Sequence, residues 1–209
     1  MSRAFAEISF TPSVLAIQEQ QGSAEGYAKF LSPDADRGDH LGLAEAEFIS
    51  KRDGFYQATV SDTGWPYVQF RGGPAGFLKV LDDKTIAYAD FRGNRQYLSA
   101  GNLADNDRVS LILMDYPNRR RLKIWGRAKL VGAKDDPLLI TRLQNPTYRA
   151  LPERAAVIKI EALDWNCPAH IPQRMTLEEL EPQLKSVRDE IGQVKAENEK
   201  LKIALGQNA

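Results

Sequence analysis

The sequence of 209 residues lacks the features that mark several large classes of protein. It has one cysteine, Cys167, so no disulfide can form within the chain, which is compatible with a reducing cytoplasm. Its 28 basic and 28 acidic residues balance, so net charge gives no argument for a nucleic-acid or membrane partner. No segment approaches the roughly 20 apolar residues of a membrane span, and the first ten residues lack the apolar run of a signal peptide. We therefore expect a cytoplasmic protein.

Good metal ligands are also scarce. There are two histidines, His40 and His170, and Cys167 with His170 supplies only half of a zinc site. The three aspartates within residues 34–39 miss the spacing of a calcium-binding EF-hand loop, so we expect a solvated loop there. We predict no metal site. For Cys167 and His170 we predict a structural role rather than nucleophilic catalysis, because Pro168 between them stiffens the turn.

The middle of the chain has the pattern of an antiparallel β protein. Short runs of strand-forming residues, separated by turn residues, predict six or seven strands, over residues 54–60, 65–70, 77–81, 85–89, 109–114, 121–131 and 155–163. A parallel sheet would need a helix after nearly every strand, but between these strands we predict helices only over 95–104 and 136–143. The pattern predicts a mainly β fold with flanking helices (α+β), as an antiparallel barrel or sandwich.

The two ends of the chain are predicted to be helical. Residues 1–42 form broken helices, one of them capped at Thr11-Pro12, and the main domain covers residues 43–174. Residues 175–209 carry a heptad repeat that begins with a capping box at Thr176 and has an asparagine, Asn198, at a core position. Pro182 is expected to kink the first turns or delay the helix. This coiled-coil pattern fits pairing with a second copy, packing on its own barrel, or recruitment of another protein.

Three segments could carry chemistry. The strand end Gln69-Phe70-Arg71-Gly72-Gly73-Pro74 combines glycines, which allow close ligand approach, with an arginine that can pair with phosphate. The segment Ala89-Asp90-Phe91-Arg92-Gly93-Asn94-Arg95-Gln96 follows a strand and is predicted to open a helix with Asn94 as its cap, a favourable place for an anion. In residues 121–127, cations and Trp125 share one strand face. Each segment also has an interpretation without a ligand: a surface turn for the first, an ordinary capped helix for the second and an exposed strand for the third.

In their order and spacing, these segments resemble the pyridoxamine 5′-phosphate oxidase-like family of FMN-binding split barrels. The resemblance is carried by Gly64 to Phe77, Gly93-Asn94-Arg95, Asn102-Leu103 before Asn106 and Val109, and Lys123 to Ala128. Residues 165–172 are similar to the C-terminal signature of a subgroup described as predicted flavin-nucleotide-binding proteins. The substrate-binding arginine and histidine pattern of the true oxidases is not evident. That absence implies a substrate other than pyridoxamine phosphate.

The resemblance implies an antiparallel FMN-binding split β-barrel with a long C-terminal helix, in a homodimer with the flavin at the interface. It implies that Gln69, Phe70 and Arg71 line the ring and ribityl chain, and that Asn94 and Arg95 lie near the phosphate. The full set of expected cofactor-binding residues is Gln69, Phe70, Arg71, Gly72, Ala89, Asp90, Asn94, Arg95, Gln96, Lys123 and Trp125. The expected activity is an FMN-dependent oxidoreductase acting on a small molecule or a nicotinamide donor. A non-catalytic flavin-binding sensor or interaction module, and a related flavin or deazaflavin as the ligand, remain alternatives.

Overall fold

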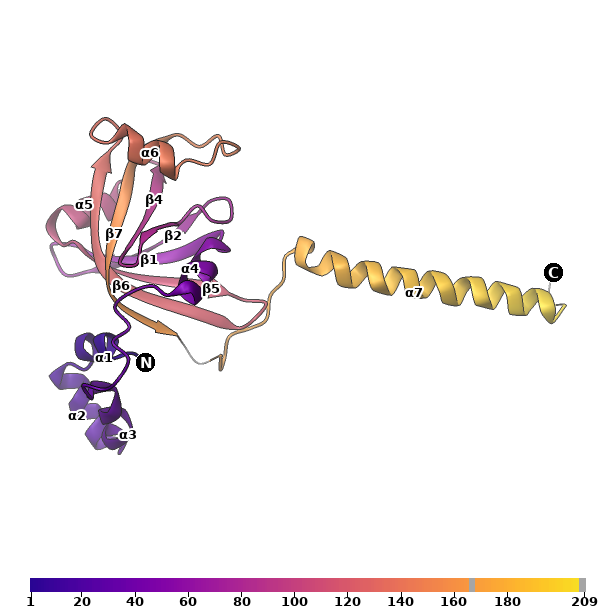
Figure 1. Ribbon diagram of the computed structural model, residues 1–209, viewed down its shortest axis with the longest axis horizontal. Helices are drawn as coiled ribbons and strands as arrows, with labels where there is room; N and C mark the ends of the chain where they lie inside the picture. The colour runs from indigo at the N-terminus through magenta and orange to yellow at the C-terminus, as the bar shows by residue number, and fades with distance from the viewer. Residues whose placement is uncertain (166–167, 207–209) are drawn as a thin grey trace. The chain divides into compact units, whose positions relative to one another are not determined.

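The computed structural model describes residues 1–165 and 168–206, so Cys167 lies outside the described residues. The chain divides into two compact units. The first contains Met1–Asp115 and Arg119–Ile171, and the second contains Tyr116–Asn118 and the chain from Pro172 onward. Figure 1 labels their helices and strands.

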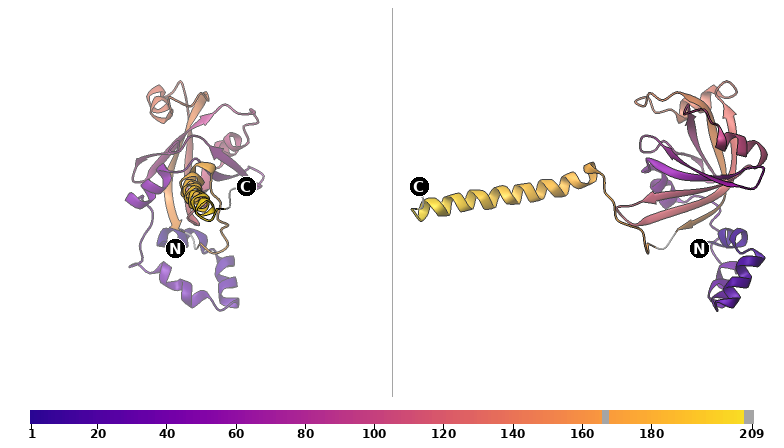
Figure 2. Two further views of the ribbon diagram at one scale, coloured as in Figure 1. Left: turned by 90° about the vertical axis from the view of Figure 1, so that its right-hand side faces the viewer. Right: turned by 180° about the vertical axis from the view of Figure 1, so that it is seen from behind.

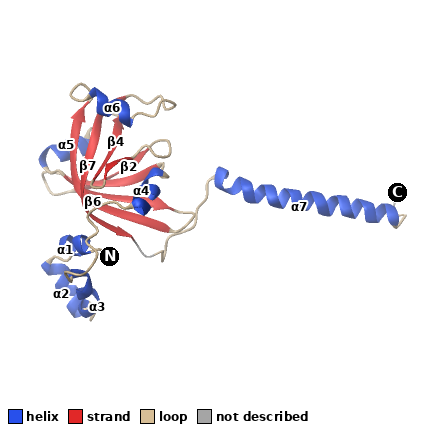
Figure 3. Cartoon of the chain, viewed as in Figure 1, coloured by secondary structure: helices blue, strands red, loops and turns tan. Residues whose placement is uncertain are grey.

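The first unit is built on one antiparallel sheet of seven strands. These are β1 Gly54–Val60, β2 Pro66–Gly72, β3 Lys79–Asp82, β4 Thr85–Phe91, β5 Arg108–Asp115, β6 Arg120–Gly132 and β7 Pro152–Trp165. Their order in the sheet is β2-β1-β5-β6-β7-β4-β3. The sheet is strongly curved, as the views in Figure 2 show, and Arg71 of β2 reaches Asp90 of β4 although these two strands do not pair. The predicted antiparallel split barrel, with flanking helices (Figure 3), is confirmed.

Strand alternation divides the residues of β2 between two faces of the sheet. Gln69 lies in register with Gln57 of β1, which in turn lies opposite Leu111 of β5, and both of these partners are fully buried. Phe70 lies opposite Tyr56, and both are exposed on the other face. Gln69 and the residues two positions away therefore face the barrel interior, whereas Phe70 faces away from it.

The interior is filled by aromatic and branched side chains from most of the strands. Phe55, Phe77 and Tyr88 pack against one another with ring centroids 5.4–6.4 Å apart. The hydroxyl of Tyr88 donates a 2.8 Å hydrogen bond to Oε1 of Gln57, so two buried polar groups pair inside the core. Burial raises the pKa of Tyr88 to about 12, so this phenol stays neutral at physiological pH.

Short helices flank the sheet, and three of them begin after a residue whose side chain caps the helix. They are α1 Arg3–Ser9, α2 Pro12–Gln20, α3 Ala24–Ala28, the 3₁₀ turn η1 Lys29–Leu31, α4 Leu43–Ser50, α5 Leu98–Asp105 and α6 Pro137–Leu143. Thr11 caps α2 as predicted, since its hydroxyl accepts a hydrogen bond from the backbone N–H of Val14. The prediction of a helix from residue 95 with Asn94 as its cap was wrong. Arg95 and Tyr97 have positive φ angles, and α5 begins only at Leu98.

The expectation of a solvated loop over residues 34–39 was also wrong for Asp39, which is buried. Its carboxylate pairs with Arg37 at 2.7 Å, Lys84 at 3.0 Å and His40 at 3.1 Å, which ties the N-terminal segment to the barrel. Burial alone would raise the pKa of Asp39, but hydrogen bonds from His40, Lys84 and Arg37 outweigh it and hold that pKa well below its usual range. In the part of the chain that the structure describes, no cluster of three metal-ligating side chains occurs.

The second unit consists mainly of α7, Leu177–Ala204. Its start is the predicted capping box: the Thr176 hydroxyl accepts from the Glu179 N–H, and the Glu179 carboxylate accepts from the Thr176 N–H. Pro182 lies inside α7, so it does not delay the helix. No helix among the described residues is long and apolar enough to span a membrane.

Candidate functional site

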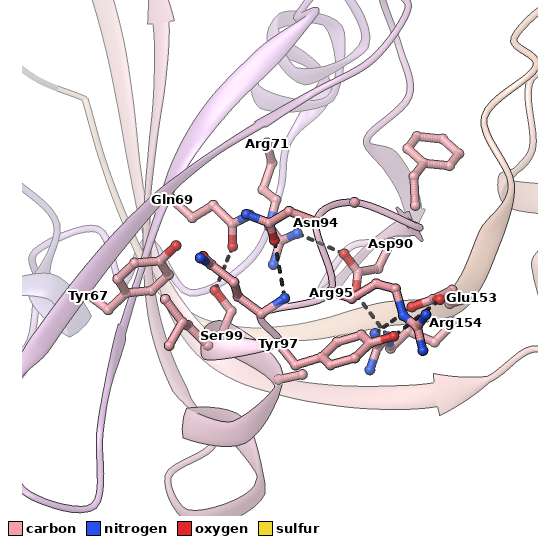
Figure 4. A pocket seen from close by; sticks show the side chains of 15 residues that line it. Tyr67, Gln69, Arg71, Asp90, Asn94, Arg95, Tyr97, Ser99, Glu153 and Arg154 are labelled. Carbon is pink, nitrogen blue, oxygen red and sulfur yellow. Dashed lines mark hydrogen bonds and ion pairs between the residues drawn. The ribbon is translucent and has the colours of Figure 1, made fainter.

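A pocket opens in the split of the barrel, between β2 and β4. Its enclosed volume is about 80 Å³, below the ~300–1,000 Å³ typical of small-molecule sites, so a single chain supplies only part of a site for a ligand of that size. Strands β2, β4 and β7, the loop after β4 and the start of α5 supply its walls (Figure 4). The lining residues are Tyr67, Gln69, Arg71, Asp90, Phe91, Gly93, Asn94, Arg95, Gln96, Tyr97, Leu98, Ser99, Ala100, Glu153 and Arg154.

Two arginines share one carboxylate at the base of this pocket. Nη1 of Arg71 lies 2.7 Å from Oδ1 of Asp90, and Nε of Arg154 lies 3.0 Å from Oδ2 of the same residue. The side chains of Arg71, Asp90 and Arg154 are 16%, 10% and 20% exposed, so the charges are screened little by water. Asp90 and Arg154 are direct partners in the β4–β7 register, while Arg71 reaches Asp90 from β2 across the split.

The two arginines keep capacity for a further acceptor. Nε of Arg71 is buried and has no hydrogen-bond partner among the residues that the structure describes. A buried donor without an acceptor costs about 1–3 kcal/mol, a cost that a bound anion would remove. The guanidinium groups also hold a fixed fork of donors, which matches the oxygen atoms of phosphate.

The loop between β4 and α5 is held in an uncommon backbone conformation. Arg95 and Tyr97 have φ angles of 64° and 56°, values that residues with a Cβ rarely adopt. The Asn94 side chain accepts a 3.2 Å hydrogen bond from the Gln96 N–H, and the Tyr97 ring lies 5.0 Å from the Arg154 guanidinium. Left-handed residues of this kind cost about 1–3 kcal/mol each and are concentrated at functional sites.

Polar contacts also fix the opposite wall. The Ser99 hydroxyl donates a 2.9 Å hydrogen bond to Oε1 of Gln69, and Ser99 is buried. Because the oxygen of the Gln69 amide accepts this bond, the amide nitrogen is left as the donor end. Tyr67 lies two residues before Gln69 and on the same strand face, so β2 presents a tyrosine, an amide and an arginine in sequence to the pocket.

The charge of the lining favours an anion. Arg71, Arg95 and Arg154 stand against the two carboxylates Asp90 and Glu153, which leaves an excess of one positive charge. The site therefore combines a cationic end suited to a phosphate monoester with tyrosine rings and amides suited to a planar heterocycle. A flavin mononucleotide has both parts, so the residues present fit that cofactor.

The structure places the eleven predicted site residues in three groups. Six of them line the pocket: Gln69, Arg71, Asp90, Asn94, Arg95 and Gln96. Phe70, Gly72 and Ala89 line a second hollow of about 130 Å³, which adjoins the pocket because Arg71 and Asp90 line both. Lys123 and Trp125 lie elsewhere, on the outer face of the sheet.

On that outer face, Lys123 and Trp125 contact the N-terminal helix. Nζ of Lys123 lies 4.5 Å from the ring centroid of Phe5 in α1 and 2.7 Å from Oδ2 of Asp164 in β7. Trp125 stacks on the same Phe5 ring, with centroids 4.6 Å apart. The register places Lys123 opposite Ile112 and therefore in the same row as Phe70. A ligand role for Lys123 or Trp125 remains a prediction that needs a second subunit.

Several lining residues were not predicted from the sequence. Tyr67 could have been found, because it shares the two-residue period of Gln69 and Arg71. Arg154 could not, because it reaches the pocket only through the pairing of β7 with β4, more than 60 positions away in sequence. Tyr97 lines the pocket with its backbone in the left-handed conformation, which nothing local in the sequence indicates.

The fold and the site define a split barrel with a cationic pocket for a small ligand. The family model described as pyridoxamine 5′-phosphate oxidase matches residues 43–166, more than half of the chain. The chain belongs to the pyridoxamine 5′-phosphate oxidase-like family. A comparison with curated proteins gives no match.

Solved structures of similar proteins come from several bacteria. HupZ from Group A Streptococcus is 16% identical, with a TM-score of 0.46, over 60% of this chain and 99% of that chain. A protein from Clostridium acetobutylicum, related to general stress protein 26, is 13% identical, with a TM-score of 0.44, over 66% and 95%. An FMN-binding protein from Syntrophomonas wolfei is 14% identical, with a TM-score of 0.42, over 71% and 97%. The family assignment rests on the family model.

Proposed function

We propose that this protein binds FMN in the pocket between β2 and β4 and acts as a cytoplasmic, FMN-dependent oxidoreductase. The observation that carries the proposal is the Arg71 guanidinium, whose buried Nε has no acceptor among the described residues although Nη1 is paired with Asp90. In this proposal Arg71, Asn94 and Arg95 hold the phosphate. Gln69 and Tyr67 lie beside the ring and the ribityl chain.

The bound flavin would supply the hydride chemistry, and the chain's own residues would bind, orient and shield it. The amide nitrogen of Gln69, oriented by Ser99, donates a hydrogen bond. The Arg71–Asp90–Arg154 cluster fixes positive charge without a mobile proton. No side chain of the pocket is required as an acid or a base in this proposal. The reaction partner is a small molecule or a nicotinamide donor rather than pyridoxamine phosphate, since the oxidases' C-terminal pattern is not evident.

A homodimer is part of the proposal because the outer face of the sheet carries an exposed apolar patch on β1 and β2. Tyr56, Val68 and Phe70 are 41%, 60% and 58% exposed, and they form a patch on neighbouring strands. Contiguous exposed apolar patches are typical of protein interfaces. A second copy on this face would cover the patch and lie beside the edge strand β2, which also forms one wall of the pocket.

The phosphate part of the proposal can be tested with a pair of arginine variants. Arg95→Ala removes a charged donor from the pocket, and we expect FMN affinity to fall at least about tenfold, since a hydrogen bond to a charged group contributes ~1.5–3 kcal/mol. Affinity for riboflavin, which has no phosphate, is expected to change little. Arg92→Ala is the matched control, because Arg92 lies on the same loop but is not among the lining residues. Equal losses for FMN and riboflavin would contradict the phosphate assignment.

A second candidate function is a flavin-binding sensor without turnover. The exposed heptad stripe on α7 favours it, since that helix could transmit the state of the ligand to a partner. The two functions separate in one assay. An oxidoreductase is reduced by NADH or NADPH and reoxidised by an acceptor over many cycles, whereas a sensor completes no cycle. Mass spectrometry of the released ligand distinguishes FMN from another flavin or a deazaflavin.

A further inference from the structure

Helix α7 carries an apolar stripe that its own unit leaves open to solvent. Leucine, valine and isoleucine recur at alternating spacings of three and four residues, the a and d positions of a heptad. From Leu184 to Leu201 the apolar members, Leu184, Val187, Ile191, Val194 and Leu201, are 41–55% exposed. The a positions are those of Leu184, Ile191 and Asn198, and the d positions are those of Val187, Val194 and Leu201.

The charges beside this stripe are sorted by sign. The e positions following the d residues carry Arg188, Lys195 and Lys202, all basic. The g positions preceding the next a residues carry Glu190 and Glu197, both acidic. Residues at e and g flank the apolar seam of a coiled coil, where they pair across it and determine the orientation of the partner.

This sorting discriminates between partner orientations. In a parallel pair, each g residue faces the e residue of the next heptad on the other helix, so Glu190 meets Lys195 and Glu197 meets Lys202. In an antiparallel pair, g faces g and e faces e, so acid meets acid and base meets base. The single-chain contact of Lys202 with Glu199, at 3.2 Å, is exposed at both ends and contributes little, so it can be exchanged.

Asn198 points to the same arrangement. It replaces an apolar residue at one a position of the seam, where a polar side chain is buried on pairing. Two parallel, in-register helices place this amide opposite its own copy, so that each satisfies the other, and any shift of register opposes it to an apolar residue. Pro182 and Gly192 fall at outward f and b positions and leave the seam uninterrupted.

From these features we propose that α7 forms a parallel, in-register, two-stranded coiled coil with α7 of a second copy of this chain. The seam runs from Leu184 to Leu201, and two ion pairs, Glu190 with Lys195 and Glu197 with Lys202, lie on each side of it. A parallel pair has a two-fold axis along its length, so the coiled coil closes at two chains. The coiled coil does not depend on the flavin.

Cysteine cross-linking of the full chain tests this proposal. In a Cys167→Ser background, Val187→Cys and Leu201→Cys each place one thiol at a d position, and Ala196→Cys places a control thiol at an outward f position. In a glutathione redox buffer we expect both d variants to form disulfide-linked dimers and the f variant to remain mainly monomeric. The two d sites lie about 21 Å apart along the helix, so an antiparallel pair cannot align both with their own copies.

Charge reversal provides the second arm, carried out on the Val187→Cys chain. Glu190→Lys with Glu197→Lys, or Lys195→Glu with Lys202→Glu, is expected to lower self-cross-linking several-fold, and mixing the two chains is expected to restore it. The proposal is overturned if only one d site cross-links, or if the f control cross-links as well as the d sites. Insensitivity to charge reversal would also overturn it. If Cys167→Ser fails to fold, the same variants are compared with Cys167 present, and peptide mass spectrometry locates each disulfide.

Discussion

Replacing Asp90 by asparagine perturbs the centre of the proposed site with almost no change of shape. In the folded protein the Asp90 carboxylate lies between Arg71 and Arg154, at 2.7 and 3.0 Å. Asp90→Asn leaves two poorly solvated guanidinium groups without their counter-charge. Removing one partner of a buried ion pair costs ~3–5 kcal/mol, and the partial exposure of both arginines reduces this to about 2–3 kcal/mol.

For a chain of this length, such a loss lowers the melting temperature by about 4–12 °C, at ~2–4 °C per kcal/mol. The assay is differential scanning calorimetry of the purified, ligand-free protein. Asp107→Asn is the matched control, because its 2.9 Å ion pair with Arg127 is exposed and contributes less than about 1 kcal/mol.

The same variant should respond more strongly to an anion. Inorganic phosphate or FMN would supply the missing negative charge, so we expect either to raise the melting temperature of Asp90→Asn more than that of the wild type. A variant that melts within about 1 °C of the wild type, or gains nothing from phosphate, would refute the reasoning that this cluster is a buried anion receptor.

Three further predictions concern the scaffold. Tyr88→Phe removes the donor to Gln57 and should lower the free energy of unfolding by about 1–3 kcal/mol in guanidinium titrations; an unchanged midpoint contradicts this. Because the pKa of Asp39 is lowered on folding, its stabilisation is present above about pH 4 and is lost as the pH falls. Acid titration should therefore destabilise the wild type more steeply than Asp39→Asn, and parallel curves would refute the assignment. Gly126→Ala places a Cβ 2.5 Å from the carbonyl oxygen of Lys159, so we expect a loss of ~1–3 kcal/mol, whereas a neutral effect in thermal melts shows that the strand yields.

The strands were predictable because their side chains alternate between a filled interior and an outer face. Residues 54–60 were predicted and found as β1, and the remaining six strands were also found, with ends that differ by a few residues. The C-terminal helix was predictable because its heptad period and its capping box are both local in sequence. Local pattern thus determines most of this fold.

The site was less predictable, because non-local contacts and unusual backbone angles form it. Arg95 and Tyr97 are neither glycine nor asparagine, so nothing local indicates their positive φ angles, and Asn94 instead suggested a helix cap. Arg154 meets Asp90 only through the register of β7 with β4. Asp39 lies in a polar stretch that suggested solvent, yet distant Lys84 holds it at the barrel.

The absorbance spectrum of the freshly purified protein, with mass spectrometry of the ligand that heat releases, tests the central claim most directly. The account predicts a yellow protein that releases FMN. If the protein is purified without its ligand, the account predicts that added FMN restores a flavin spectrum. A colourless protein that fails to take up FMN, or a released ligand with neither a phosphate nor a flavin-like ring, would contradict the assignment of the pocket.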